Sequence, residues 1–171
     1  MKLIASIMII AASTLWGMNK AFRYSKRVNE LRQLQQAFKL LETEIVYGFT
    51  PLAEAFLHIS QRHNGSIGKL FAQMGIGVND NQNLTTGQLW EVTLDRIWSE
   101  TALKKRDREI LHQLGAQLGA TDRQDQIKHI QLALRMLESE EMDAQHEQKM
   151  YASMYRNLGV LGGLLLVILM Y

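Results

Sequence analysis

The chain has 171 residues, with 19 lysines and arginines against 17 aspartates and glutamates, so its formal net charge is +2. The length suits one domain, and a hydrophobic share of 47% is too high for a disordered chain. The lack of cysteine excludes disulfides, thiol catalysis and cysteine-bound metal centres, and the near-balanced charge gives no sign of nucleic-acid binding. A single proline favours long helices over a turn-rich β fold.

Both ends of the chain are uncharged: residues 3–19 and 157–171 contain no Asp, Glu, Lys or Arg. As helices they would be about 25 and 22 Å long, the short end of what a membrane span needs. We therefore predict an N-terminal transmembrane segment in residues 1–19 and a short C-terminal one in residues 157–171. A cleaved signal peptide is the alternative for the first segment, because small residues occur at positions 11–13.

Four basic residues follow the first apolar segment, namely Lys20, Arg23, Lys26 and Arg27, with no acid before Glu30. We expect them to contact anionic lipid headgroups, where each charge contributes about 1 kcal/mol. Because cytoplasmic flanks are enriched in Lys and Arg, the same bias predicts that the domain formed by residues 20–156 lies in the cytoplasm.

The first helix is predicted to run on from the membrane segment and to stop at Tyr47 and Gly48, since glycine suits a helix end. A second helix should begin with Thr50 as N-cap and Pro51 as its first residue, and end at residues 64–65, Asn-Gly. Apolar residues spaced three and four apart give the first helix a buried stripe. They are Leu31, Leu34, Phe38, Leu41 and Ile45.

The middle of the chain alternates helix and loop signals. A short helix is predicted over residues 66–74, followed by a loop over residues 75–83, GIGVNDNQN. Thr85 and Gln88 are spaced as a capping box at the start of the next helix. In that helix we expect Trp90 and Trp98 to pack in the core, with a binding pocket as the alternative.

The last two helices are separated by Gly119, which should end a helix over residues 101–118. Thr121 and Gln124 are spaced as a second capping box. The final helix is predicted to be the longest and to run into the last apolar segment, although Glu141 and Gln148 interrupt its heptad seam. The seam residues are Ile127, Ile130, Leu134, Leu137, Glu141, Ala144, Gln148, Tyr151, Tyr155 and Leu158.

Because each helix must bury its apolar stripe against another, the elements predict an all-α fold. We expect an antiparallel bundle of about six helices. The first and last helices should be long and continue into the membrane segments.

Signatures of catalysis are weak. The chain has no Gly-rich phosphate loop, Gly-x-Ser-x-Gly or His-Glu-x-x-His. Glu109 and His112 match the Glu-x-x-His of di-iron bundles, but they flank the apolar stripe of Ile110, Leu111 and Leu114, which favours solvated side chains over metal ligands. We predict no enzyme activity, no catalytic residue, no metal and no cofactor.

The densest basic run in the domain is Lys104, Lys105, Arg106 and Arg108. One interpretation is a solvated helix face, and the other is a contact patch for an acidic partner protein. Nucleic acid is disfavoured because no aromatic residues interleave the charges.

Two glycines four apart, Gly159 and Gly163, lie in the last apolar segment. Small residues at this spacing let membrane helices approach closely, so they are candidate transmembrane packing residues. A glycine-rich span without a specific partner is the alternative.

Several strings carry a resemblance to a known family. They are LLETEIVYGFTPLAEA at residues 40–55, IW at 97–98 followed by TAL at 101–103, KHI at 128–130 and the tail LGVLGGLLLVIL at 158–169. Over nearly its whole length the chain resembles the stage III sporulation protein AB family of endospore-forming bacteria. Residues 41–59 also resemble, more weakly, the helical cytoplasmic domain of F-type platform proteins of type II secretion and type IV pilus machines.

The resemblance implies a role in a trans-envelope complex that links the mother cell to the forespore. It implies a non-enzymatic platform in the mother-cell membrane facing the forespore, beside a cytoplasmic ATPase, the stage III sporulation protein AA, and other membrane components. Platform proteins carry two such domains and three spans, whereas this chain offers one domain and at most two spans, so a homo-oligomer stays open. An extracytoplasmic structural element of the intermembrane channel is the alternative role.

Overall fold

A computed structural model describes residues 2–48, 50–80, 84–119, 122–152, 154, 157–158, 161–162 and 168. These residues form helices and connecting turns without a β-strand, so the predicted all-α class is confirmed for them. The elements are α1 (Lys2–Thr43), a π-helical turn (Glu44–Gly48), α2 (Leu52–Arg62), α3 (Gly65–Asp80), α4 (Thr86–Trp98), α5 (Lys105–Gln117), α6 (Arg123–Glu147) and a second π-helical turn (Gln148–Ala152).

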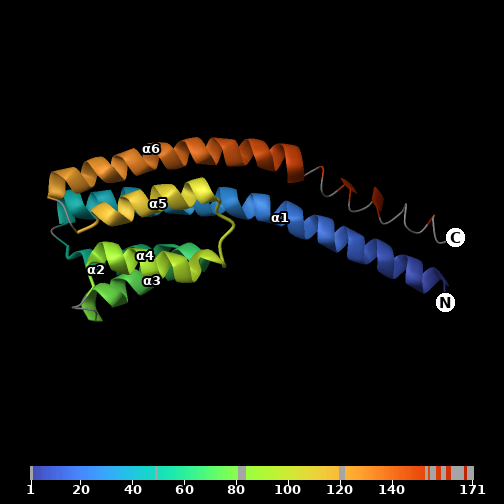
Figure 1. Ribbon diagram of the computed structural model, residues 1–171, viewed down its shortest axis with the longest axis horizontal. Helices are drawn as coiled ribbons and strands as arrows, with labels where there is room; N and C mark the ends of the chain where they lie inside the picture. The colour runs from blue at the N-terminus through green and yellow to red at the C-terminus, as the bar shows by residue number, and fades with distance from the viewer. Residues whose placement is uncertain are drawn as a thin grey trace. The chain divides into compact units, whose positions relative to one another are not determined.

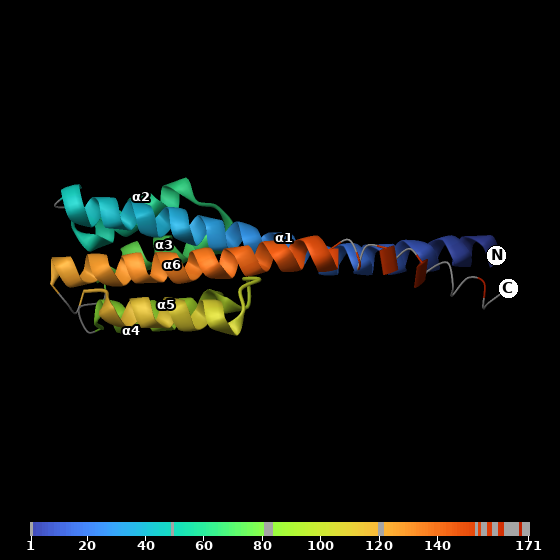
Figure 2. The same ribbon diagram turned by 90° about the horizontal axis from the view of Figure 1, so that it is seen from above.

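The chain divides into two compact units, one of residues 29–141 and one of residues 1–28 with 142–171. In the first unit α2 packs on α3, α3 on α4, and α4 on α5. Figures 1 and 2 show α5 running beside α6 in both views. This unit is the predicted helical bundle, and it holds every candidate site residue between positions 104 and 112.

Aromatic rings fill the centre of this bundle. Trp90, Phe38 and Phe71 are fully buried, and the Phe38 and Phe71 ring centroids lie 6.2 and 6.0 Å from that of Trp90. The indole Nε1 of Trp90 donates a 2.9 Å hydrogen bond to the Leu111 carbonyl of α5. The predicted core position of Trp90 is therefore confirmed, whereas Trp98 is only half-buried.

The stripe predicted for α1 is buried from Leu31 to Leu41, with Ile45 half-buried in the π-helical turn. Helix α6 runs antiparallel to α1, because residues farther along α1 contact residues nearer the start of α6. Arg32 contacts Glu141 at 2.7 Å, and Glu42 accepts a 2.7 Å hydrogen bond from Gln131.

Polar residues of the α6 seam have partners on α1. Glu141 accepts hydrogen bonds of 2.7 Å from Arg32 Nε and from the buried Gln35 Nε2. In the smaller unit Gln148 donates a 2.9 Å hydrogen bond to Ser25 Oγ. The two residues that interrupt the predicted apolar seam thus occupy it with their hydrogen bonds satisfied.

The start of α2 differs from the prediction. Pro51 is the residue before the helix, and no side chain caps the helix there. Thr50 Oγ1 instead donates a 2.8 Å hydrogen bond to Glu44 Oε2 in the π-helical turn. The hydroxyl closes the preceding turn, so it is not the predicted N-cap.

The glycines after α2 also have other roles than those predicted. Gly65 begins α3 with φ at 69°, the left-handed region that glycine favours, so it opens a helix where we expected one to end. The predicted loop over residues 75–83 is wrong as far as Asp80, because α3 continues to that residue. A Cβ on Gly75 would lie 2.6 Å from Leu57 Cγ and 3.0 Å from the Ala53 carbonyl oxygen, so α2 packs too closely for a side chain there. A Cβ on Gly77 would lie 2.8 Å from Leu89 Cδ1, at the end of a side chain that would have to shift.

Two other helix ends agree with the sequence. Thr85 Oγ1 accepts from the Gln88 backbone N–H at 3.3 Å, and Gln88 Oε1 accepts from the Thr85 backbone N–H at 3.0 Å, so the predicted capping box is confirmed. Gly119 adopts a φ of 76° just after α5, as a helix-ending glycine does. The predicted cap Thr121 lies outside the described residues; Asp122 Oδ1 accepts from the Asp125 N–H at 2.9 Å.

Among the residues that the structure describes, no helix joins the length and the apolar character that crossing a membrane requires. The predicted continuation of the bundle into membrane segments therefore has no support from the described helices. Most of the predicted C-terminal segment lies outside the described residues.

Candidate functional site

The loop before α5, residues 99–104, is held in place by contacts from α1 and α3. The Glu30 carboxylate of α1 is 4% exposed, and its Oε2 accepts a 2.7 Å hydrogen bond from the Ala102 backbone N–H. From α3, Ser66 Oγ donates to the Glu100 carbonyl at 3.0 Å, and Lys69 Nζ contacts the Glu100 carboxylate at 2.7 Å. These contacts from two helices fix the position of the amino end of α5.

The first turn of α5 carries the predicted basic residues. Asp107 is fully buried, and its Oδ2 accepts a 2.7 Å hydrogen bond from the Lys104 backbone N–H. The side chains of Lys104 and Lys105 are exposed. A helix amino end carries partial positive charge, so two lysines there are locally unfavourable and add to a positive field. The arrangement suits a negatively charged partner surface.

The other two members of the basic run contact residues of their own bundle. Arg106 is exposed, with Nη1 3.8 Å from Glu140 Oε1 on α6. Arg108 turns toward α4, where it pairs with Asp95 and lies over the Trp98 ring at 5.2 Å from the centroid. The predicted four-residue patch therefore divides: Lys104, Lys105 and Arg106 point outward, while Arg108 joins α5 to α4.

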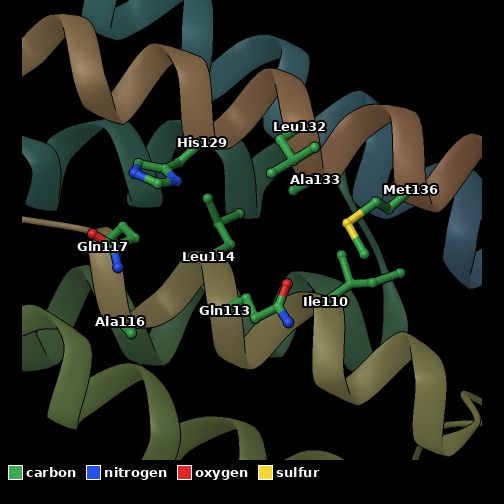
Figure 3. A pocket seen from close by; sticks show the side chains of 9 residues that line it. All are labelled: Ile110, Gln113, Leu114, Ala116, Gln117, His129, Leu132, Ala133 and Met136. Atoms are coloured by element: carbon green, nitrogen blue, oxygen red, sulfur yellow. The ribbon is translucent and has the colours of Figure 1, made fainter.

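A groove of about 270 Å³ lies between α5 and α6, beginning one helical turn beyond the Arg106–Glu140 pair. Figure 3 shows Met136 of α6 opposite Ile110 of α5, with His129 and Gln117 at the far end. The walls are mostly apolar. The lining residues are Ile110, Gln113, Leu114, Ala116, Gln117, His129, Leu132, Ala133 and Met136.

Asp125 and Lys128 form an ion pair within α6, just before the groove residue His129 in the chain. Lys128 Nζ lies 2.8 Å from Asp125 Oδ1. This hydrogen bond lowers the pKa of the Asp125 carboxyl and raises the pKa of the Lys128 ammonium group. The pair therefore stays ionised near neutral pH and adds little net charge to the first turns of α6.

The Glu-x-x-His pattern does not form a metal centre among the described residues. Glu109 is exposed, and His112 Nδ1 lies 3.3 Å from Glu91 of α4. In the described part of the chain, no three His, Asp or Glu side chains gather closely enough to bind a metal ion. The pattern matches a helix face that packs against α4.

The residues predicted to face lipid lie in the smaller unit and differ in exposure. Arg23 is exposed and Lys26 is half-buried, whereas the side chain of Lys20 lies outside the description. Arg27 is 3% exposed and contacts Glu147 at 3.4 Å, a position that does not suit a headgroup contact. The predicted packing glycines, Gly159 and Gly163, lie outside the described residues.

Glu30, the residue that positions the amino end of α5, was not predicted from the sequence. A signal was present, because Glu30 is one turn before Leu34 and so lies on the same inner face as the apolar stripe. An acid on a buried stripe needs a hydrogen-bond donor, and here the donor is the backbone of the loop that carries the lysines.

A sequence relative and a solved structure that are similar to this chain are both stage III sporulation AB proteins. The model of the family described as stage III sporulation protein AB matches residues 2–171. The stage III sporulation protein AB of Bacillus subtilis (strain 168) is 37% identical over 170 residues, which are 99% of each chain. The solved structure of a stage III sporulation protein AB has a TM-score of 0.69 and 37% identity, and the match covers 73% of this chain and 98% of that one.

Proposed function

The chain belongs to the stage III sporulation protein AB family, and on this basis we propose that it acts in sporulation as a non-enzymatic platform that docks a cytoplasmic ATPase. The ATPase is the stage III sporulation protein AA, which the family resemblance implies. The platform belongs to the complex that joins the mother cell to the forespore.

The observation that supports the docking face is the outward-facing lysine pair on a fixed loop. Lys104 and Lys105 are exposed at the amino end of α5, where the helix dipole adds to their positive charge. The loop that precedes them is tied to α1 by the buried carboxylate of Glu30. A rigid and positively charged corner suits a scaffold, because little order is lost when an acidic surface binds to it.

The docking proposal is tested by reversing the two exposed charges. Lys104→Glu with Lys105→Glu places acids at a helix amino end, which the helix dipole favours, so the fold should be retained. Arg108 is left unchanged because it pairs with Asp95. We expect the double variant to lose capture of the co-expressed ATPase while its far-UV circular dichroism is unchanged.

A matched control changes the same number of charges elsewhere. Arg62 and Arg135 are exposed on α2 and α6, so Arg62→Glu with Arg135→Glu alters the net charge equally. This control should capture the ATPase as the unchanged chain does. Equal capture by the Lys104 and Lys105 variant would exclude this face as the docking site.

Membrane anchorage through residues 3–19 and 157–171 is part of the same proposal, with the bundle in the cytoplasm of the mother cell. Because the chain has no cysteine, Asn64→Cys introduces a single thiol at an exposed position between α2 and α3. A membrane-impermeant maleimide should label it only after the cells are permeabilised. Labelling in intact cells would place the bundle outside and favour the structural element of the intermembrane channel.

A further inference from the structure

A second groove lies between α3 and α4 and has no part in the docking proposal. Its volume is about 320 Å³, and three large apolar side chains on it are 40–56% exposed: Ile76, Leu84 and Val92. Large apolar groups gathered on one exposed face mark a contact surface more often than scattered ones do.

The ends of this groove carry opposite charges. Gly77 of α3 packs on Leu89 of α4, and the short connection after Asp80 makes the two helices antiparallel. In this register Asp80 of α3 lies near the amino end of α4, whereas Arg96 lies about 15 Å farther along α4. The groove therefore runs from a carboxylate, across apolar side chains, to a guanidinium group.

Neither charge is satisfied within the described part of the bundle. Asp80 and Arg96 are exposed, and neither side chain forms a hydrogen bond or ion pair with another described residue. Asp80 is also the last residue of α3, where the helix dipole is negative and disfavours an acid. A cation brought to this position would remove that local repulsion.

We propose that this α3–α4 face binds a second copy of this chain about a two-fold axis. A two-fold axis through the middle of the groove turns the face by half a revolution, so Asp80 of each copy meets Arg96 of the other. Each dimer thus gains two ion pairs and a central apolar contact. The same face is self-complementary in charge and in apolar character, which a partner of one charge sign would not match.

The position of the axis follows from the register. Asp80 is level with residue 86 of α4, so the point midway between the two charges is level with residue 91. Val92 and Ile76 lie within about one residue, or about 1.5 Å, of that point. The Val92 side chains of the two copies are therefore expected next to each other.

The charges give a test with a specific rescue. In the full-length chain, purified in mild detergent, Asp80→Arg sets arginine against arginine twice, and Arg96→Asp sets aspartate against aspartate twice. Each variant alone should self-associate at least tenfold more weakly than the unchanged chain in sedimentation velocity. An equimolar mixture of the two variants should associate again, because each then offers the charge that the other lacks.

Control variants with the same charge changes at other exposed sites, Glu109→Arg and Arg135→Asp, should associate as the unchanged chain does. The proposal would be overturned if the unchanged chain were monomeric at about 100 μM, since stable protein interfaces persist well below that concentration. It would also be overturned if the single variants associated normally or if their mixture stayed dissociated.

A second measurement tests the axis itself. Val92→Cys introduces the only thiol in the chain. On the proposed axis the two copies of residue 92 face each other, as a disulfide requires, since its Cα atoms are about 4.4–6.8 Å apart. Mild oxidation should convert this variant to a covalent dimer. Gln61→Cys, exposed on α2, should form little covalent dimer. Equal cross-linking of both variants, or of neither, would contradict the proposed axis.

Discussion

Replacing Gly115 of α5 by alanine tests the packing of the bundle core. A Cβ at this position would lie 2.0 Å from Trp90 Cδ1 and 2.7 Å from Trp90 Cγ. Carbon atoms in favourable contact are about 3.5–4.0 Å apart, so the indole would have to move by about 1.5 Å. Trp90 cannot move freely, because it is fully buried between Phe38 and Phe71 and donates a hydrogen bond to Leu111.

The expected change in the free energy of unfolding is the sum of two destabilising effects and one stabilising effect. Adding a methyl group to a packed core costs about 1–3 kcal/mol. Weakening the hydrogen bond of the Trp90 indole costs up to about 1 kcal/mol more. Helix propensity acts in the other direction, since alanine is favoured over glycine by about 1 kcal/mol inside a helix. We expect Gly115→Ala to lower the free energy of unfolding by about 2 kcal/mol, measured by urea denaturation followed by circular dichroism.

The neighbouring residue supplies the matched control. Ala116 is exposed on the same helix, so Ala116→Gly reports helix propensity alone and should cost about 1 kcal/mol. If Gly115→Ala instead raised the free energy of unfolding by a similar amount, propensity alone would govern the site. The close contact between Gly115 and Trp90 would then be refuted.

Three further changes test other parts of the bundle by the same denaturation. Leu134→Ala removes a side chain that is 7% exposed in the α6 seam and should cost about 2–5 kcal/mol; a loss below about 1 kcal/mol would mean that the seam is misplaced. Glu30→Ala leaves the Ala102 N–H without its acceptor and should cost about 1–3 kcal/mol, and an unchanged midpoint would show that the loop does not depend on this carboxylate. Burial, and then the charge of Arg62, lower the pKa of His63 below its usual value of 6.5. The unfolded chain therefore binds a proton more readily than the folded one, so the free energy of unfolding falls as the pH drops below 6.5. His63→Gln should reduce that fall, and a pH dependence identical to that of the unchanged chain would contradict this prediction.

The elements that the sequence predicted well are those with local causes. The stripe from Leu31 to Leu41 is buried because its spacing keeps the residues on one helix face, and this depends on the chain's own geometry. The same holds for the capping box of Thr85 and Gln88, whose two hydrogen bonds join residues three apart. Such patterns need no knowledge of what packs against them.

The predicted loop at residues 75–83 failed for a non-local reason. Glycines usually favour turns, but Gly75 and Gly77 lie where α3 approaches Leu57 of α2 and Leu89 of α4. The need for small residues comes from the neighbouring helices, and one sequence does not state which helices those are. The stabilisation from close packing exceeds the cost of about 1 kcal/mol that a glycine brings to a helix.

The candidate site was predicted as four equivalent charges, and the structure makes them unequal. A run of basic residues shows that a helix face is charged, but it does not show which side chains reach an acid on the next helix. Arg108 pairs with Asp95 of α4, and Arg106 lies 3.8 Å from Glu140 of α6, while the side chains of Lys104 and Lys105 are exposed. That distinction depends on how α4 packs against α5, which the spacing of charges along α5 alone does not specify.

Polar residues on α1, among them the buried Glu30 and Gln35, explain why the amino end of α5 is held in one position. Gln35 and Arg32 both hydrogen-bond Glu141, which fixes the register of α6 along α1, and one turn away Glu30 binds the loop that starts α5. Glu30 and Gln35 are buried, and a buried polar group left without its partner costs about 1–3 kcal/mol. A register shift of either neighbour would break these hydrogen bonds, so the inner face of α1 determines where Lys104 is presented. The inward-facing polar residues and the outward-facing lysines are thus two parts of one arrangement, and the proposed docking platform needs both.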